Sequence, residues 1–346
     1  MAFTTRGKVV TVLLTLVLVA GGVYVWLVLT KKIEGPISLL NPPDSSADVP
    51  DNCPLTGVNP DGDVPDRPAL AIKVENADGA RPQAGMERAD VTYEERVEGG
   101  ITRFIVIYQC QDSERIGPVR SARPVDPDVL LQLGTETVFG YSGAADEVLK
   151  IVARSGLVDV NFGKFVEAYR RDPNREQPHN LYTTTEDLYA AAKDPTGVPK
   201  TLWQYDPAEP EQAARPASSI HVPFLEADVV WTWDAKRGLW FRAQDGGPHL
   251  MEDGTQLLAT NVIVQEVQTF CSGLYDVNNV CVDEVSVVGT GNAIVFRNGK
   301  AIRGTWVREF TEDVTKFLDR RGREIRLDPG TTWVELVPTD IKATFQ

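Results

Sequence analysis

An alternating stretch around Gly99-Gly100 constrains the fold of this chain more than any other segment. Valine, tyrosine and isoleucine recur at every second position within Val91–Val97 and again within Ile101–Ile107. That spacing is the period of a half-buried β-strand. Glycine adopts the positive φ of a tight turn without strain, so the stretch predicts a β-hairpin.

The length of the hairpin loop decides which side chains face each other. A two-residue loop would place Arg96 opposite Arg103, and like charges disfavour that pairing. A three-residue loop at Glu98–Gly100 instead pairs Glu95 with Arg103 and gathers the apolar side chains on one face. We therefore predict the three-residue loop. The Glu95–Arg103 pair is then either a structural ion pair at the edge of the core or part of a cleft, because an isolated buried charge is too costly.

Near the N-terminus, an uncharged run of 22 residues, Val9–Thr30, is long enough to cross a bilayer as an α-helix. It continues directly to Lys31-Lys32, which predicts an uncleaved signal anchor behind a short cytoplasmic tail at residues 1–8. Prolines, serines and aspartates then crowd residues 31–66. This composition predicts an extended stalk that packs no core.

The four cysteines predict the compartment of the folded part. Cys271 and Cys281 flank a turn-like segment and suit a loop-closing disulfide, and Cys53 could then be bridged to Cys110. Disulfides would place the body outside the cytoplasm, in a single-pass protein of the cell membrane. The alternative is four buried free thiols.

The charge balance excludes some classes of function. The chain has 35 basic and 49 acidic side chains, and the first 32 residues hold four of the basic ones and no acidic one. An acidic body is repelled by phosphate backbones, so we expect no nucleic-acid partner. The sequence also lacks metal-binding spacings and phosphate- or dinucleotide-binding glycine patterns, so we expect no metal and no cofactor.

Residues 67–205 alternate strand patterns with helix patterns. Asp126 is the predicted N-cap of one helix, with Pro127 at the first helical position, and Thr183–Glu186 has the spacing of a capping box before another. The alternation predicts a mixed α/β (α+β) domain. It ends at a linker, residues 206–218, that is rich in proline, alanine and glutamate.

Residues 219–346 show strand patterns only. Asn298-Gly299 between two of them is a strong hairpin signal. This half therefore predicts a small antiparallel all-β domain. Its tryptophans suit a core better than a platform for stacking sugars: Trp231, Trp233, Trp240, Trp306 and Trp333.

Four motifs in order resemble those of the YerB-like lipoprotein family of bacterial envelope proteins: VEGGITRF (97–104), IGPVRSARP (116–124), PHNLYT (178–183) and GTW (304–306). The resemblance covers about residues 67–338. It implies an N-terminal α/β part, a C-terminal β part and an extracytoplasmic location. It implies no chemistry, because the function of the family is not established. The chain departs from the family in having a membrane helix where a lipidated cysteine is expected.

Polar residues in three of these motifs are the candidates for a site. Arg120 and Arg123 lie on a loop beside Ser121, and with Arg103 they could bind a carboxylate or phosphate. The alternative is that each arginine pairs with a carboxylate of the chain. In the loop Pro178–Thr183, His179 and Asn180 could act as a base or orient a ligand, or they could only hold the loop together.

Among the hairpin carboxylates, Glu95 is the candidate for catalysis. Glu94 and Glu98 are predicted to face solvent, and Arg103 is expected to lower the pKa of Glu95. The sequence thus predicts a membrane-anchored envelope protein that binds an anionic wall component through its arginines. Two alternatives are a wall-glycan hydrolase using Glu95 and a non-catalytic scaffold for other envelope proteins.

Overall fold

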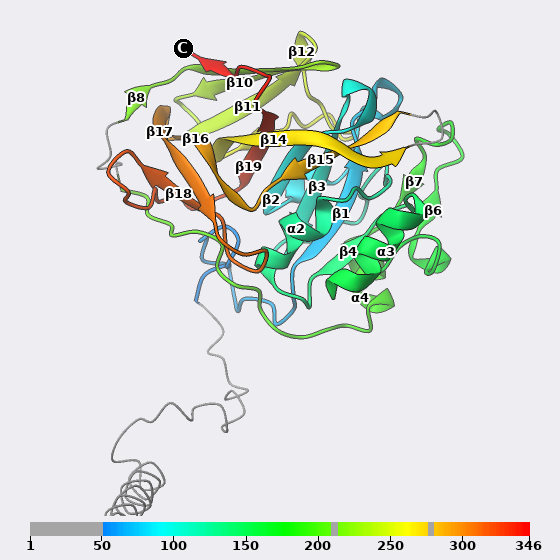
Figure 1. Cartoon of the computed structure of the whole chain (residues 1–346). Helices are drawn as coiled ribbons and strands as arrows, with labels where there is room; N and C mark the ends of the chain where they lie inside the picture. The colour runs from blue at the N-terminus through cyan, green and yellow to red at the C-terminus, as the bar shows by residue number, and fades with distance from the viewer. Residues whose placement is uncertain (1–50, 209–213, 276–279) are drawn as a thin grey trace, which may run out of the picture. The chain divides into compact units, whose positions relative to one another are not determined.

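The structure, a computed structural model, describes residues 51–208, 214–275 and 280–346 (Figure 1). The predicted membrane segment at residues 9–30 lies outside the described residues and stays a prediction. Within the described ranges, no helix combines the length and the apolar character needed to cross a bilayer.

A twelve-stranded mixed sheet forms the centre of the folded part. Its strand order is β18-β17-β16-β14-β19-β2-β3-β1-β4-β5, with β15 paired to β14 and β8 paired to β17. The strands are β1 (Leu70–Glu75), β2 (Val91–Arg96), β3 (Thr102–Tyr108), β4 (Val138–Gly140), β5 (Val158–Asp159), β8 (Arg215–Pro216), β14 (Asn261–Tyr275), β15 (Cys281–Ser286), β16 (Gly289–Arg297), β17 (Lys300–Arg308), β18 (Lys316–Asp319) and β19 (Thr332–Pro338).

A second, six-stranded sheet and, within the described residues, three short α-helices complete the fold. The second sheet consists of β9 (Ser219–Phe224), β10 (Ala227–Asp234), β11 (Leu239–Gln244), β12 (Gly247–Pro248), β13 (Leu258–Ala259) and β20 (Thr344–Phe345). The helices are α2 (Asp126–Leu130), α3 (Asp146–Ser155) and α4 (Thr185–Ala191), and β6 (Arg170–Arg171) pairs with β7 (Leu181–Tyr182). Figure 1 shows the helices gathered near β4, away from β10 and β11.

Both faces of the central sheet are buried, because successive residues of a strand point to opposite sides and each side is covered. On one side, Phe104 packs in a cluster with Trp231 and Trp240 of the second sheet. On the other, Ile105 packs in a cluster with Val129 of α2 and residues of α3. Trp306 and Trp333 are also buried. These four tryptophans are core residues, as predicted.

The predicted hairpin and its register are confirmed. In the β2–β3 pair, Glu95 lies opposite Arg103 and Tyr93 lies opposite Ile105. The loop has three residues, and its glycines Gly99 and Gly100 have φ values of 75° and 79°. The predicted turn at Asn298-Gly299 also joins two paired strands, β16 and β17.

Strand β19 joins the two parts that the sequence separates. It runs parallel to β14 on one side and parallel to β2 on the other. Strands from residues 67–205 and 219–346 therefore share one sheet, and the described residues pack within one compact unit. The expected purely antiparallel arrangement of the second half holds for β9–β13 but not for β14 and β19, because β14 and β19 lie far apart in the sequence and their parallel pairing leaves no local pattern.

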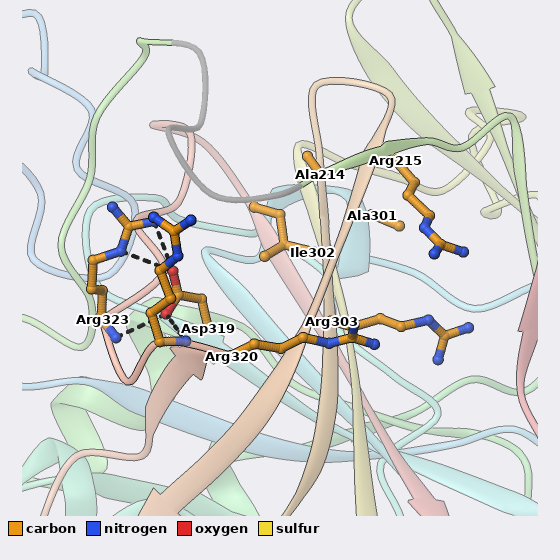
Figure 2. A pocket seen from close by; sticks show the side chains of 9 residues that line it. Ala214, Arg215, Ala301, Ile302, Arg303, Asp319, Arg320 and Arg323 are labelled. Atoms are coloured by element: carbon orange, nitrogen blue, oxygen red, sulfur yellow. Dashed lines mark hydrogen bonds and ion pairs between the residues drawn. The ribbon is translucent and has the colours of Figure 1, made fainter.

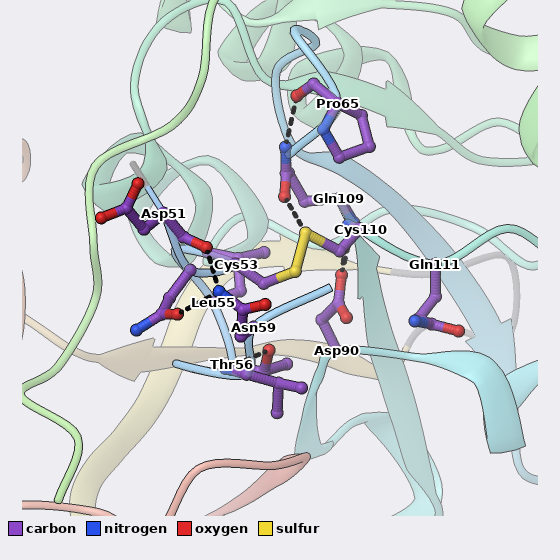
Figure 3. The surroundings of a disulfide bond; sticks show 12 residues. Asp51, Cys53, Leu55, Thr56, Asn59, Pro65, Asp90, Gln109, Cys110 and Gln111 are labelled. Atoms are coloured by element: carbon purple, nitrogen blue, oxygen red, sulfur yellow. Dashed lines mark hydrogen bonds between the residues drawn. A yellow bond between two sulfur atoms is a disulfide. The ribbon is translucent and has the colours of Figure 1, made fainter. Parts of the chain in front are cut away.

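The structure of residues 51–66 contradicts the prediction that the extended stalk continues to residue 66. Leu55 is fully buried and Val64 nearly so. A disulfide between Cys53 and Cys110 ties this segment to the chain just after β3 (Figure 3). The predicted stalk would therefore have to end before Asp51, since a few apolar side chains and one disulfide hold the following residues on the body. The second predicted disulfide, Cys271–Cys281, is also present.

The helix starts differ slightly from the predicted ones. Asp126 is the first residue of α2 and not its cap, and its carboxylate accepts a hydrogen bond from the amide of Arg123 at 2.7 Å. The cap of α4 is Thr184, whose hydroxyl accepts from the amide of Asp187 at 2.9 Å. The predicted box began one residue earlier, at Thr183, whose hydroxyl donates to a distant carbonyl instead.

Candidate functional site

The motifs at residues 97–104, 116–124 and 178–183 meet at the C-terminal end of β1. The segment after Gly117 runs along this strand: the amide of Glu75 donates to Pro118 and the amide of Arg120 donates to Lys73, both through main-chain oxygens. On its other side, the amide of Val119 donates to the carbonyl of Leu181 at 2.7 Å. The β2–β3 hairpin lies on the opposite edge of β1, so the polar side chains of all three motifs share one region.

The deepest part of this region is an ion cluster below α2. The Nζ atom of Lys73 lies 2.6 Å from the Asp126 carboxylate and also forms an ion pair with Glu95. All three side chains are at most 1% exposed. Burial raises the pKa of Glu95 to about 7, although the Lys73 ammonium acts in the opposite direction. The prediction that Arg103 lowers the pKa of Glu95 is therefore wrong. The cost of desolvating the Glu95 carboxylate outweighs the effect of the nearby cations, and the ion-pair partner of Glu95 is Lys73.

Above this cluster lie the three predicted arginines. Arg123 is paired with Glu98, and the Nε atom of Arg120 lies 3.0 Å from a carboxylate oxygen of Glu75. Arg103 is nearly buried and donates to the carbonyl of Ser121 at 3.2 Å. Among the described residues, no carboxylate pairs with Arg103. Burial, together with the charges of Arg123 and Arg120, lowers the pKa of Arg103 to about 9.

The outer edge of the region is formed by Arg120 and His179. Both face Glu75: the Nδ1 atom of His179 lies 2.8 Å from one of its oxygens, and Arg120 contacts the other. The Glu75 side chain is 2% exposed, whereas those of Arg120 and His179 are 27% and 26% exposed. A ligand from solvent would therefore meet Arg120 and His179 first.

Two predicted site residues play smaller parts than expected. Ser121 contributes its main-chain carbonyl to the arginines. Asn180 holds its own loop together: its amide oxygen accepts from Arg171, and its amide nitrogen donates to the carbonyls of Asp172 and Arg175. Glu98, predicted to face solvent, is largely covered by its pairing with Arg123, so that prediction is wrong.

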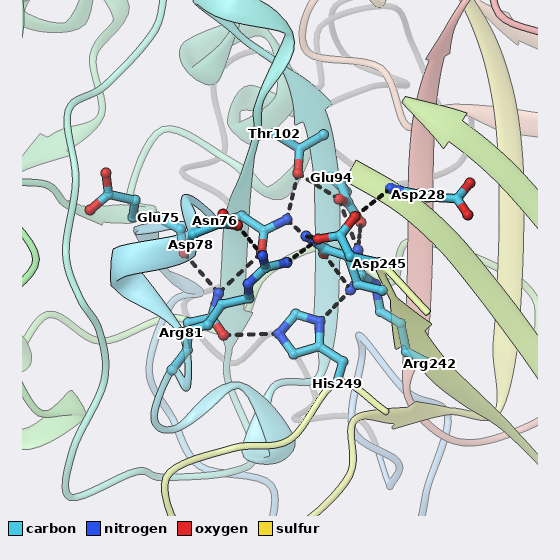
Figure 4. Close-up of polar contacts among 12 residues, drawn as sticks. Glu75, Asn76, Asp78, Arg81, Glu94, Thr102, Asp228, Arg242, Asp245 and His249 are labelled. Atoms are coloured by element: carbon cyan, nitrogen blue, oxygen red, sulfur yellow. Dashed lines mark hydrogen bonds and ion pairs between the residues drawn. The ribbon is translucent and has the colours of Figure 1, made fainter. Parts of the chain in front are cut away.

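Glu94 was also predicted to face solvent and is instead completely buried between the two sheets (Figure 4). The Nη2 atom of Arg242 in β11 donates to both oxygens of Glu94, at 2.9 and 2.7 Å. Thr102 donates to the same carboxylate at 2.7 Å. The prediction failed because it assumed that only one face of the hairpin was covered.

The side chains of His249 and Glu335 complete this second cluster. The pKa of His249 is held well below its usual range by burial and by the Arg242 charge. Its Nδ1 therefore accepts from Arg242, and its Nε2 donates to Gln83 at 2.8 Å. Burial and the neighbouring Glu94 raise the pKa of Glu335 well above its usual range. The Oε1 atom of Glu335 accepts a hydrogen bond from the indole of Trp231 at 2.8 Å.

Sequence reasoning did not single out Lys73, Glu75 or Arg242, and it wrongly placed Glu94 in solvent. A usable signal was present in two of the strands. Lys73 interrupts the apolar run LAIKVE of β1, and Arg242 interrupts the apolar and aromatic run LWFRAQ of β11. A cation inside such a run implies a buried partner of opposite charge.

The geometry gives little support to hydrolysis by Glu95. A glycosidase needs two carboxyl groups that reach the sugar. Glu95 is 1% exposed and held by Lys73, with α2 above it. Among the described residues, no three His, Cys, Asp or Glu side chains are grouped so as to hold a metal ion.

The raised pKa of Glu95 predicts how stability depends on pH. Unfolded Glu95 loses its proton near its ordinary pKa of 4.5, whereas the folded protein keeps it up to about 7. The folded state therefore binds more protons in this window, and the free energy of unfolding should fall as the pH rises from about 4.5 to about 7. Asp90, whose pKa is raised to about 6 by burial, and Glu335, whose pKa is also raised, add to the same trend, whereas His249, whose pKa is lowered, acts against it.

Urea denaturation at about pH 5 and about pH 7.5 would measure this trend. We expect a lower midpoint at the higher pH for the wild type, and a smaller difference for Glu95→Gln. Glu147→Gln, in a side chain that is 57% exposed, is the control and should leave the difference unchanged. A Glu95→Gln variant with the full wild-type difference would show that Glu95 is ionised in the folded protein.

Comparisons with known proteins fit the arrangement described above. Residues 55–197 match a family model described as "Protein of unknown function (DUF3048) N-terminal domain", and residues 220–334 match the model of the corresponding C-terminal domain. A Bacillus subtilis (strain 168) protein named "Putative lipoprotein YerB" is 28% identical over 298 residues, which are 82% of this chain and 86% of that protein. The crystal structure of the YerB protein from Bacillus subtilis matches with a TM-score of 0.73 and 24% identity, over 85% of this chain and 99% of that one.

Proposed function

The chain belongs to the DUF3048 family of YerB-like proteins, and we propose that it is an extracytoplasmic envelope protein that binds an anionic wall component. Both family models bear out the resemblance that the motifs indicated. The name of the YerB relative describes that protein as a lipoprotein, and the two disulfides of this chain suit an oxidising compartment. In this chain, the uncharged run at residues 9–30 would serve as the anchor.

The observation that carries the binding proposal is the incomplete neutralisation of Arg103. The Arg103 guanidinium is nearly buried, and its Nε atom has no hydrogen-bond partner. The positive charges of Arg123 and Arg120 lie close enough to lower its pKa. The surrounding acids are already engaged: Glu98 with Arg123, and Glu75 with Arg120 and His179. An anion that entered beside Arg120 would offset this excess of positive charge.

Binding to isolated wall sacculi tests the proposal. The purified full-length protein in mild detergent would be incubated with sacculi and sedimented. Arg120→Ala and Arg123→Ala should each weaken retention about tenfold, since each removes charge-assisted hydrogen bonds. Arg154→Ala removes the same charge from the exposed end of α3 and is the matched control.

The other outcomes are equally informative. Equal retention of all four proteins would overturn binding at this site. Release of soluble wall fragments by the wild type and not by Glu95→Gln would identify an enzyme instead. If no protein is retained and nothing is released, a scaffold for other envelope proteins becomes the better interpretation. A thermal melt of each variant separates lost binding from lost folding.

A further inference from the structure

A pocket of about 230 Å³ lies at the edge of the central sheet that ends in β17 and β18 (Figure 2). The outer edge of β17 is covered by β8 at Lys300 and Ala301 and by β18 from Gly304 onward. Ile302 and Arg303 lie between these two short partners. The pocket lies at this edge of the sheet, in the gap between β8 and β18.

The lining of this pocket is strongly basic in an otherwise acidic protein. Asp319 is its single acidic residue, and its carboxylate is paired with Arg323 at 2.9 Å. The four other arginines of the lining are exposed, and none of them forms an ion pair with a carboxylate within the part of the chain that the structure describes: Arg215, Arg303, Arg320 and Arg321. So many like charges around one hollow repel each other unless an anion lies between them.

The shape of the pocket indicates what kind of anion fits. Its volume is below the roughly 300–1,000 Å³ of pockets that hold drug-sized molecules, so it suits one compact anionic group. A second pocket of about 380 Å³ shares Arg303, Asp319 and Arg320 with it, but adds the carboxylate of Glu266 and no further arginine. The two hollows therefore adjoin across these residues. Guanidinium groups match the geometry of phosphate oxygens through paired hydrogen bonds.

We propose that the first pocket binds a phosphate group of an anionic polymer. A lipid headgroup has the same phosphate chemistry, but a membrane-docking surface also presents large apolar side chains to the bilayer. Here the large apolar residue of the lining, Ile302, is 1% exposed. This site is distinct from the cluster around Arg103, and its ligand binding does not depend on the function proposed for that cluster.

Binding of the full-length protein to inorganic polyphosphate tests the inference. We expect the double variant Arg320→Gln/Arg321→Gln to weaken binding at least about tenfold and to reduce the slope of log affinity against log salt by about one per arginine. Lys236→Gln/Arg237→Gln removes the same charge from the exposed β10–β11 turn and should behave as the wild type. Polyglutamate, which carries carboxylates in place of phosphates, should bind more weakly than polyphosphate.

Several results would overturn the inference. Polyphosphate binding that is equal in the wild type and in the Arg320/Arg321 double variant would show that these arginines hold no phosphate. Equal affinity for polyglutamate would remove the preference for phosphate. Arginine-dependent binding to phosphatidylglycerol vesicles, with none to polyphosphate, would identify a membrane surface instead. Loss of polyphosphate binding in Arg120→Ala alone would assign the phosphate to the Arg103 cluster, which would contradict this inference and leave the proposed function intact.

Discussion

Replacing Arg242 by methionine should lower the free energy of unfolding by about 3–5 kcal/mol, the usual loss when one partner of a buried ion pair is removed. The substitution would leave the completely buried Glu94 carboxyl without its guanidinium partner, with the Thr102 hydroxyl as a donor and the Glu335 carboxyl beside it. It would also remove the donor to the Nδ1 atom of His249. Chemical denaturation monitored by tryptophan fluorescence would measure the loss, because Trp231 and Trp333 lie in the same core cluster.

Two further variants make this result specific. Arg237→Met changes an exposed arginine near the start of the same strand, whose nearest carboxylate oxygen is 3.8 Å away, and should cost well under 1 kcal/mol. Arg242→Met combined with Glu94→Gln removes both charges and should recover much of the loss. If Arg242→Met proved as mild as Arg237→Met, the cluster between the sheets would not depend on this ion pair.

Removing the Cys53–Cys110 disulfide should have an effect of similar size. The bond closes a loop of 57 residues, and the entropy of loop closure in the unfolded chain corresponds to about 4 kcal/mol. The double variant Cys53→Ser/Cys110→Ser should unfold at a correspondingly lower denaturant concentration. Residues 51–66 should also become the first site of proteolytic cleavage, since the disulfide ties them to the chain after β3.

The second disulfide provides a matched comparison. Cys271–Cys281 closes a loop of only 10 residues, for which the same relation gives about 3 kcal/mol. Cys271→Ser/Cys281→Ser should therefore be the milder of the two double variants. The reverse order would show that loop-closure entropy does not govern the stabilising effect of these bonds.

The two neighbouring glutamates of β2 show how far sequence patterns reach. Glu94 and Glu95 point to opposite faces, as the two-residue period requires. Glu95 forms an ion pair with Lys73 below α2, whereas Glu94 is paired with Arg242 of the second sheet. The two-residue period of the strand correctly placed Glu94 and Glu95 on opposite faces. It could not reveal that both faces of the central sheet are covered by other parts of the chain.

Local chemistry in the sequence determined the β2–β3 hairpin with its three-residue loop and the turn at Asn298-Gly299, and it suggested the two cysteine pairs that the structure contains. Each depends on residues close in the chain or on a few chemically distinctive side chains. Only the tertiary structure decided that β19 joins both halves, that residues 51–66 pack on the body, and that Lys73 and Asp126 surround Glu95. The physical reason is that backbone periodicity fixes the direction of a side chain, whereas its partners depend on which distant segments cover that face of the sheet.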